Sequence, residues 1–131
     1  MAMAIRDAGV PAGSVGYISA HGTSTRHNDA KESLAIRNVF GPHADKLAVS
    51  SQKSQMGHTI GGAGAIESAV CALSLHHGML TPTINYREPD PECDLDYVPL
   101  QSRKVDNLQA AMTNSFAFGG HNCSILFERH S

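Results

Sequence analysis

Two histidines, His21 and His58, have the setting of active-site residues. His21 belongs to the run Ala-His-Gly-Thr-Ser-Thr at 20–25, and His58 ends the run Ser-Gln-Lys-Ser-Gln-Met-Gly-His at 51–58. A short apolar stretch precedes each run, and α/β folds place their chemistry in the loops at strand ends. We therefore expect both imidazoles to emerge from the ends of strands, at the edge of the sheet where an active site would lie.

The strands that would position these histidines can be read from short apolar runs. We expect strands at 15–19 and 47–50, each leading into one histidine turn. Two further strands, at 109–113 and 122–127, are close enough in sequence to form an antiparallel pair. The glycine-rich stretch between them would then be a connecting loop.

Three helices are expected between the strands. The first covers 2–8 and ends at Gly9, and the second runs to Phe40 from a capping box made by Asp29 and Glu32. The third covers 63–77, and the helical spacing of its apolar residues predicts that one stripe of the helix faces the core. That stripe consists of Ile66, Val70, Leu73 and His77.

Four prolines mark the segment 81–99 as an ordered surface excursion, because proline removes a backbone donor and disfavours a helix or central strand. The order of elements is then helix, strand, helix, strand, helix, loop, strand, strand. This order indicates an α/β fold built in layers.

The composition excludes several classes of protein. The chain has 131 residues, is 41% hydrophobic and 17% charged, and carries a formal net charge of -2 without a basic stripe. It offers no electrostatic reason to bind nucleic acid or an anionic membrane. No apolar run approaches a membrane span, and the first nine residues lack the apolar centre of a signal peptide. We expect a cytoplasmic protein.

The three cysteines, Cys71, Cys93 and Cys123, are widely spaced and form no Cys-x-x-Cys pair. The sequence therefore predicts reduced thiols, no metal site, and no activated nucleophile among them.

Three motifs, in this order and spacing, resemble the C-terminal half of a β-ketoacyl-acyl-carrier-protein synthase of the elongating type. The first is His-Gly-Thr-Ser-Thr at 21–25 followed by Asp29 and Glu32. The second is Ser-x-Lys-Ser-x-x-Gly-His at 51–58 followed by Gly-Ala-Ile-Glu at 64–67. The third is Asn-Ser-Phe-x-Phe-Gly-Gly-x-Asn at 114–122. The resemblance covers essentially the whole chain and is closer to fatty-acid synthases of bacteria and organelles than to modular polyketide enzymes.

The resemblance implies a thiolase-like layered fold, in which residues 1–131 form one of two halves, a mixed sheet packed against helices. It also implies a decarboxylative Claisen condensation of malonyl-carrier protein with an acyl thioester, in fatty-acid or polyketide biosynthesis. His21 and His58 would donate hydrogen bonds to the thioester oxygen and stabilise the enolate. Lys53 paired with Glu67 would support them.

The substrate side of the site also follows from the resemblance. Thr23 and Thr25 would bind the phosphopantetheine arm of an acyl-carrier protein, which carries the substrate, so no other cofactor is expected. Phe118 would gate the site, and the backbone of Gly119 would approach the acyl group. The chain departs from the family at Ala117, where glycine is usual, and at Arg26, where proline is usual.

The family's nucleophilic cysteine lies in the N-terminal half, and none of the three motifs contains it. We therefore expect the chain alone to be inactive, to expose apolar surface, and to need an N-terminal half or another synthase chain as partner. One alternative is a non-catalytic subunit, or truncated relic, that binds carrier protein. Another is a thiolase relative using coenzyme A, which the lack of a cysteine in the run 114–120 disfavours.

Overall fold

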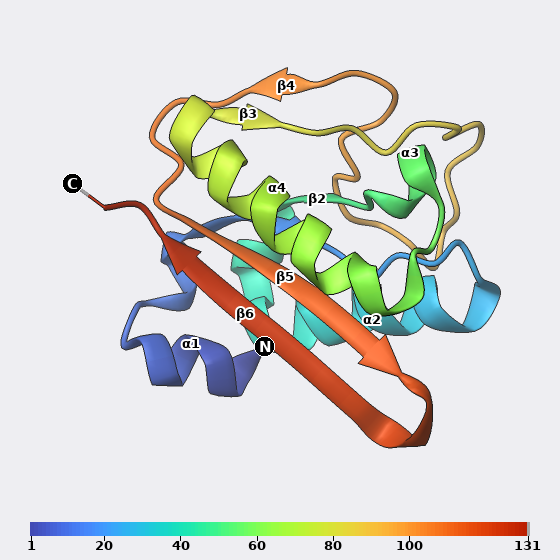
Figure 1. The fold of residues 1–131 in the computed structure, drawn as a ribbon, viewed down its shortest axis with the longest axis horizontal. Coiled ribbons are helices and arrows are strands. Elements are labelled where there is room, and N and C mark those ends of the chain that lie inside the picture. The colour runs from blue at the N-terminus through green and yellow to red at the C-terminus, as the bar shows by residue number, and fades with distance from the viewer. Residues whose placement is uncertain (131) are drawn as a thin grey trace.

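The computed structural model describes residues 1–130 as a sheet with helices on both faces (Figure 1). The helices and strands, in chain order, are α1 (Ala2–Ala8), β1 (Val15–Ser19), α2 (Arg26–Phe40), β2 (Ala48–Ser50), α3 (Lys53–Met56), α4 (Ala63–His77), β3 (Met79–Leu80), β4 (Arg103–Lys104), β5 (Ala110–Ala117) and β6 (His121–Glu128). Short 3-10 helices cover Ala12–Ser14, Gly41–Lys46, Ile60–Gly62 and Phe118–Gly120. None of the helices in this described part is long and apolar enough to cross a membrane.

The main sheet has the strand order β2-β1-β5-β6. β1 pairs in parallel with β2 and with β5, so that Ile18 lies opposite Val49 on one side and Met112 on the other. β6 returns antiparallel to β5. Because β1, β2 and β5 are parallel, the loops that follow them gather at one edge of the sheet.

Alternating side chains of the strands fill a separate hydrophobic cluster on each face of the sheet. On one face, Ile18 and Met112 pack with Ile36 and Phe40 of α2 and with Ile5 of α1. On the other face, residues including Tyr17 and Ala111 pack against Cys71 and Leu75 of α4. Figure 1 shows α4 in front of the sheet, α2 partly hidden behind the strands, and α1 at the lower left. The α/β layered fold predicted from the sequence is confirmed.

The second helix begins earlier than predicted, and its cap is different. α2 starts at Arg26, and the Thr25 hydroxyl accepts the Asn28 N–H at 3.4 Å. The predicted capping box of Asp29 and Glu32 is wrong, because Glu32 is the seventh residue of the helix and its carboxylate reaches the His21 loop instead.

The predicted core stripe of α4 is also wrong, although the helix has the predicted bounds. Leu73 is 56% exposed, and Ile66 and Val70 are only half-buried. The stripe that faces the sheet consists instead of Ala63, Glu67, Cys71, Ser74 and Leu75. The small side chains of this stripe let α4 approach the sheet closely, so the more apolar stripe faces away from the sheet. A helix that is apolar on both faces is typical of a layer between two others.

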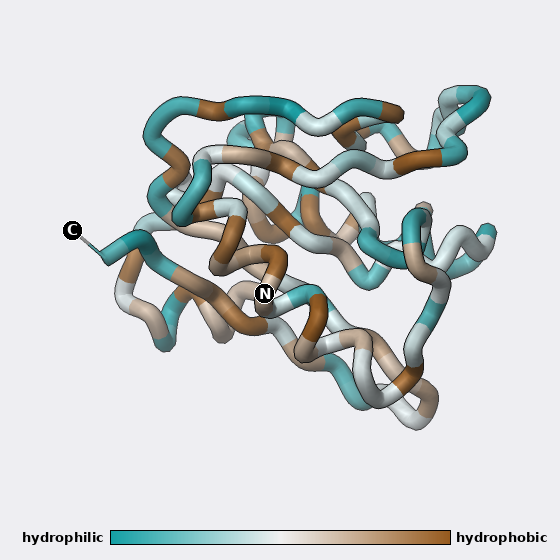
Figure 2. The backbone as a smooth tube through the Cα atoms, turned by 45° about the horizontal axis from the view of Figure 1, so that its top comes forward, coloured by the Kyte–Doolittle hydropathy of each residue, from teal (hydrophilic) through white to brown (hydrophobic). Residues whose placement is uncertain are grey.

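The β5–β6 hairpin is longer than the sequence predicted. The strands also include residues 114–117 and residue 121, which were expected to be loop, and only Phe118–Gly120 forms the turn. The excursion after α4 is confirmed as an irregular surface segment, held by single bridges of Thr83 to Pro99 and of Ala48 to Asp96. Its residues are mostly hydrophilic, and it forms the hydrophilic loop at the upper right of Figure 2. The short β3–β4 pair beside it was not predicted.

Candidate active site

His21 and His58 lie against each other at the edge of the sheet where β1, β2 and β5 end. Their ring centroids are 5.4 Å apart and the ring planes meet at 82°. Phe116 of β5 also contacts His21, with ring centroids 5.6 Å apart. The structure therefore brings together the two histidines that the sequence singled out, although α2, β2 and α3 separate them along the chain.

The backbone around His58 sets which of its nitrogens carries the proton. The Ile60 N–H donates to His58 Nδ1 at 3.2 Å, so Nδ1 accepts and the proton of the neutral ring sits on Nε2. Ile60 reaches this position with a φ of 53°, which is strained for a β-branched residue. His58 is exposed, so its Nε2–H is available to a ligand. Sequence reasoning missed Ile60, because backbone conformation leaves no signature in an isoleucine.

His21 is held in a different state, since only 8% of the residue is exposed. Burial, followed by the positive charge of Lys53 and the proximity of His58, lowers the pKa of His21 to about 4. The imidazole is therefore neutral at neutral pH. Its Nδ1 is buried and has no hydrogen-bond partner among residues 1–130.

The lowered pKa of His21 predicts a pH-dependent stability. The unfolded chain binds a proton at His21 near pH 6.5, whereas the folded chain resists it down to about pH 4. His21 therefore favours folding above pH 6.5, and this contribution is lost as the pH falls from there toward 4. When the pH is lowered from 7 to 5, we expect the melting temperature of the His21→Gln variant to fall less than that of the native chain. The exposed His27→Gln is the control and should behave like the native chain. An equal fall for His21→Gln and the native chain would contradict the prediction.

Glu32 fixes the His21 loop from α2. Its carboxylate is buried and accepts the backbone N–H of His21 and that of Gly22, each at 3.0 Å. Asn114 Nδ2, at the start of the third motif, donates to the same carboxylate at 3.1 Å. Burial raises the pKa of Glu32, and the backbone donors oppose that shift. One side chain thus joins β1, α2 and β5 at the site.

The two histidine turns also touch directly. Ser51 Oγ donates to the Gly22 carbonyl at 2.6 Å. A Cβ atom at position 22 would lie 2.5 Å from Ser51 Cβ, and Gly22 has a φ of 41°, so this contact requires glycine.

Lys53 and Glu67 form an ion pair beneath the turn that carries His58. Their side chains are 6% and 1% exposed, respectively, and Lys53 Nζ donates to one Glu67 oxygen. The other oxygen, Oε2, has no partner among the described residues. Burial raises the pKa of Glu67, whereas the bond from Lys53 lowers it. The predicted pairing of these two residues is therefore present.

Thr23 and Thr25 present their hydroxyls together. The two Oγ1 atoms are 3.0 Å apart, and Thr25 is exposed while Thr23 is half-buried. Thr25 also caps α2, which fixes the backbone between the pair.

Phe118 and Gly119 lie at the tip of the β5–β6 hairpin, at the same edge of the sheet. The Phe118 side chain is fully exposed, and Gly119 has a φ of 80°. Within residues 1–130, the ring contacts of His21 come from His58 and Phe116. The structure therefore places Phe118 beside the site without bringing it into ring contact with the histidines.

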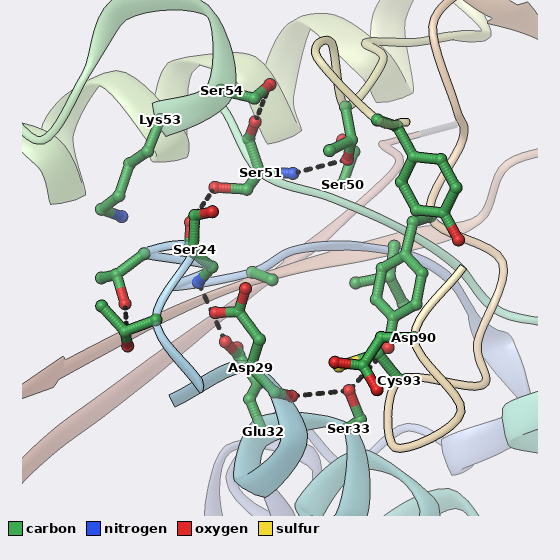
Figure 3. Close-up of a pocket in the computed structure, with 18 of the residues that line it drawn as sticks. Ser24, Asp29, Glu32, Ser33, Ser50, Ser51, Lys53, Ser54, Asp90 and Cys93 are labelled. Atoms are coloured by element: carbon green, nitrogen blue, oxygen red, sulfur yellow. Dashed lines mark hydrogen bonds between the residues drawn. The ribbon is translucent and has the colours of Figure 1, made fainter. Parts of the chain in front are cut away.

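A cavity of about 630 Å³ opens beside the histidine pair (Figure 3). It lies between the start of α2, the turn after β2 and the excursion after β3. Thr23, Thr25 and Lys53 line it, and His21, His58 and Phe118 do not. The predicted site residues thus divide into two sets and a support. His21, His58, Phe118 and Gly119 lie at the edge of the sheet, whereas Thr23, Thr25 and Lys53 face the adjoining cavity, and Glu67 is buried as the partner of Lys53.

Two of the three cysteines lie in settings that disfavour the thiolate. Burial raises the pKa of Cys71 to about 12 and, with nearby acidic groups, raises that of Cys93. Cys123 is exposed on β6. In the described part of the chain, no three His, Cys, Asp or Glu side chains are grouped so as to hold a metal ion.

These features can be compared with known proteins. The family described as Beta-ketoacyl synthase, C-terminal domain, matches residues 1–87. The chain belongs to the β-ketoacyl synthase family. This confirms the resemblance that the three motifs indicated.

Individual members of the β-ketoacyl synthase family are similar along nearly all of the chain. It is 48% identical to 3-oxoacyl-[acyl-carrier-protein] synthase 2 of Synechocystis sp. over 130 residues, which are 99% of this chain and 31% of that protein. The solved ishigamide ketosynthase/chain length factor is 39% identical with a TM-score of 0.93, over 98% of this chain and 31% of that one.

A second solved structure is a type II polyketide ketosynthase in complex with its acyl-carrier protein. It is 42% identical with a TM-score of 0.92, and the match covers 98% of this chain and 31% of that one. The chain thus spans about a third of the length of these relatives. The thiolase-like layered fold expected from the sequence is confirmed by these neighbours.

Proposed function

We propose that this chain forms the C-terminal part of a 3-oxoacyl-acyl-carrier-protein synthase and carries its malonyl-decarboxylating residues. The observation that supports this most is the His21–His58 pair, with rings 5.4 Å apart and the His58 proton directed to Nε2. The substrate would be malonyl on the phosphopantetheine arm of an acyl-carrier protein. The acceptor would be an acyl group held by a cysteine outside the three motifs.

In this proposal the histidines act on the thioester carbonyl of malonyl. As carbon dioxide leaves, the bonding electron pair moves toward the carbonyl oxygen and forms an enolate. The N–H of His58, with that of His21, donates to this oxygen, and each such donor contributes on the order of 3 kcal/mol to the transition state. Because His21 is neutral, it adds no positive charge of its own that would also bind the malonyl carboxylate before the reaction.

The remaining predicted residues support that step. The Lys53–Glu67 pair holds α3 and α4 together and places a positive charge near the histidines. The hydroxyls of Thr23 and Thr25 hydrogen-bond the amides of the pantetheine arm. Phe118 and Gly119 cover the acyl end of the site.

The outward apolar stripe of α4 supports a second layer formed by the cysteine-bearing half of the synthase. Leu73 is 56% exposed on this stripe, and Ile60, just before the helix, is 76% exposed. Burial of such a surface would stabilise the assembly by about 25 cal/mol for each Å² of apolar area.

Reconstitution tests this proposal. The chain is mixed or co-expressed with the cysteine-bearing half of a close relative, and release of carbon dioxide from malonyl-carrier protein is measured. We expect release only when both parts are present, followed by condensation once the cysteine is acylated. Binding of carrier protein without carbon dioxide release would instead indicate a non-catalytic subunit. Condensation of two acyl-coenzyme A thioesters without release of carbon dioxide would instead favour a thiolase-type enzyme.

A further inference from the structure

The cavity beside the histidine pair has the size of a small-molecule site. Its volume of about 630 Å³ falls within the range of 300–1,000 Å³ that is usual for ligand pockets. The start of α2 forms one wall, and the excursion forms another (Figure 3).

Most charged groups that line this cavity already have partners. The Glu32 carboxylate accepts two backbone and two side-chain N–H groups, and Lys53 is paired with Glu67. Asp29 accepts Asn28 Nδ2 at 3.0 Å, and Asp90 accepts the Glu92 N–H at 2.9 Å. These bonds stabilise the carboxylates in place and reduce their need for a cation.

Three charged side chains in this described lining have no such partner, and they are Arg26, Arg87 and the exposed Glu88 next to Arg87. Arg26 lies on the α2 wall and Arg87 on the excursion, and both are exposed. No carboxylate of residues 1–130 lies within 4.0 Å of either guanidinium group. A guanidinium group presents paired N–H donors that fit a phosphate or carboxylate, so the two arginines favour an anionic ligand between the walls.

The position of Arg26 decides which end of a ligand it would meet. It follows Thr25 directly, and along residues 21–26 the chain runs from the buried His21 to the exposed Arg26. A pantetheine arm has its thioester at one end, two amides in the middle and a phosphate diester at the carrier-protein end. With the thioester at the histidines and the amides at the threonines, the phosphate comes to the outer end of the cavity.

We propose that Arg26, assisted by Arg87 across the cavity, binds the phosphate diester of the phosphopantetheine arm. This inference rests on the proposed function. Arg26 is then a binding residue that distinguishes a pantetheine arm with its phosphate from one without it.

The test compares phosphopantetheine with pantetheine as ligands of the chain. Binding is followed by two-dimensional NMR, with the Arg26 and Thr25 amides as reporters. We expect the native chain to bind phosphopantetheine about tenfold more tightly, since a hydrogen bond to a charged group contributes about 1.5 kcal/mol or more. Arg26→Ala should remove this preference, Arg26→Lys should keep part of it, and Arg6→Ala on α1 is the matched control. Equal binding of both ligands by the native chain, or of neither, would overturn the inference.

A second arm separates the phosphate from the acidic surface of a carrier protein. Apo carrier protein, which lacks the arm, should bind the native chain and Arg26→Ala equally. A loss of apo-protein binding on substitution would overturn the phosphate assignment in favour of protein docking.

Decarboxylation by the reconstituted synthase, measured in parallel, keeps the two proposals apart. Carbon dioxide release without a phosphate preference would refute only the role of Arg26. A phosphate preference without any release would refute only the decarboxylating function.

Discussion

Replacing His58 by alanine is expected to slow malonyl decarboxylation by the reconstituted synthase about 10²–10³-fold, the usual cost of one oxyanion donor. The reason is geometric, because the Ile60 amide occupies Nδ1 and leaves the Nε2–H of His58 as the donor that a substrate oxygen can reach. Since His58 is exposed, the substitution should change the free energy of unfolding by less than about 0.5 kcal/mol. Activity and stability are therefore expected to separate.

The measurement combines carbon dioxide release with denaturant unfolding of the same preparation. His76→Ala, an exposed histidine near the end of α4, is the matched control and should keep full activity. Decarboxylation that survives the loss of His58 would contradict the assigned role. A large loss of stability would show that the residue is structural.

Replacing Lys53 by methionine is expected to destabilise the chain by about 3 kcal/mol, because it leaves the carboxylate of Glu67 buried without its cation. Loss of Lys53 also removes the interaction that lowers the pKa of Glu67, so that burial drives this carboxyl toward its protonated form. The exposed Lys31→Met provides the control and should be nearly neutral.

The double variant Lys53→Met with Glu67→Leu distinguishes folding from catalysis. Apolar residues of similar size can replace a buried ion pair with little loss of stability, so the double variant should recover most of the unfolding free energy. Its decarboxylation rate should stay at least about tenfold below that of the native chain if the charge of Lys53 supports the histidines. A double variant that regains both properties would show that the pair only holds α3 to α4.

Part of the fold was predictable because it depends on local pattern. The strand at 15–19 and the helices at 2–8 and 63–77 have the predicted bounds. An apolar run marks the strand, and a glycine directly after each helix marks its end. The motif spacing likewise identified His21, His58, Lys53, Glu67, Thr23, Thr25, Phe118 and Gly119 as candidates, and the Lys53–Glu67 pair forms as expected.

Other features were not predictable, because they depend on which groups meet in space. Glu32 has the spacing of a capping box, yet its carboxylate binds the His21 loop and Asn114, which lie on other elements. On α4, hydropathy alone favoured the stripe with Leu73, but the sheet packs against the stripe with the smaller side chains. The hydropathy pattern along the chain shows that a helix has an apolar face. When a helix has two such faces, the pattern does not show which one fits the surface of the sheet.

The sequence by itself determined the family, the alternation of helices and strands, and the residue types that can stabilise an enolate. These depend on composition and spacing along the chain. Only the tertiary structure decided the 5.4 Å approach of the two imidazoles, the lowered pKa of His21 and the proton position on His58. Those properties arise from burial, from parallel strands ending at one edge, and from the strained amide of Ile60, all of which exist only once distant segments have packed together.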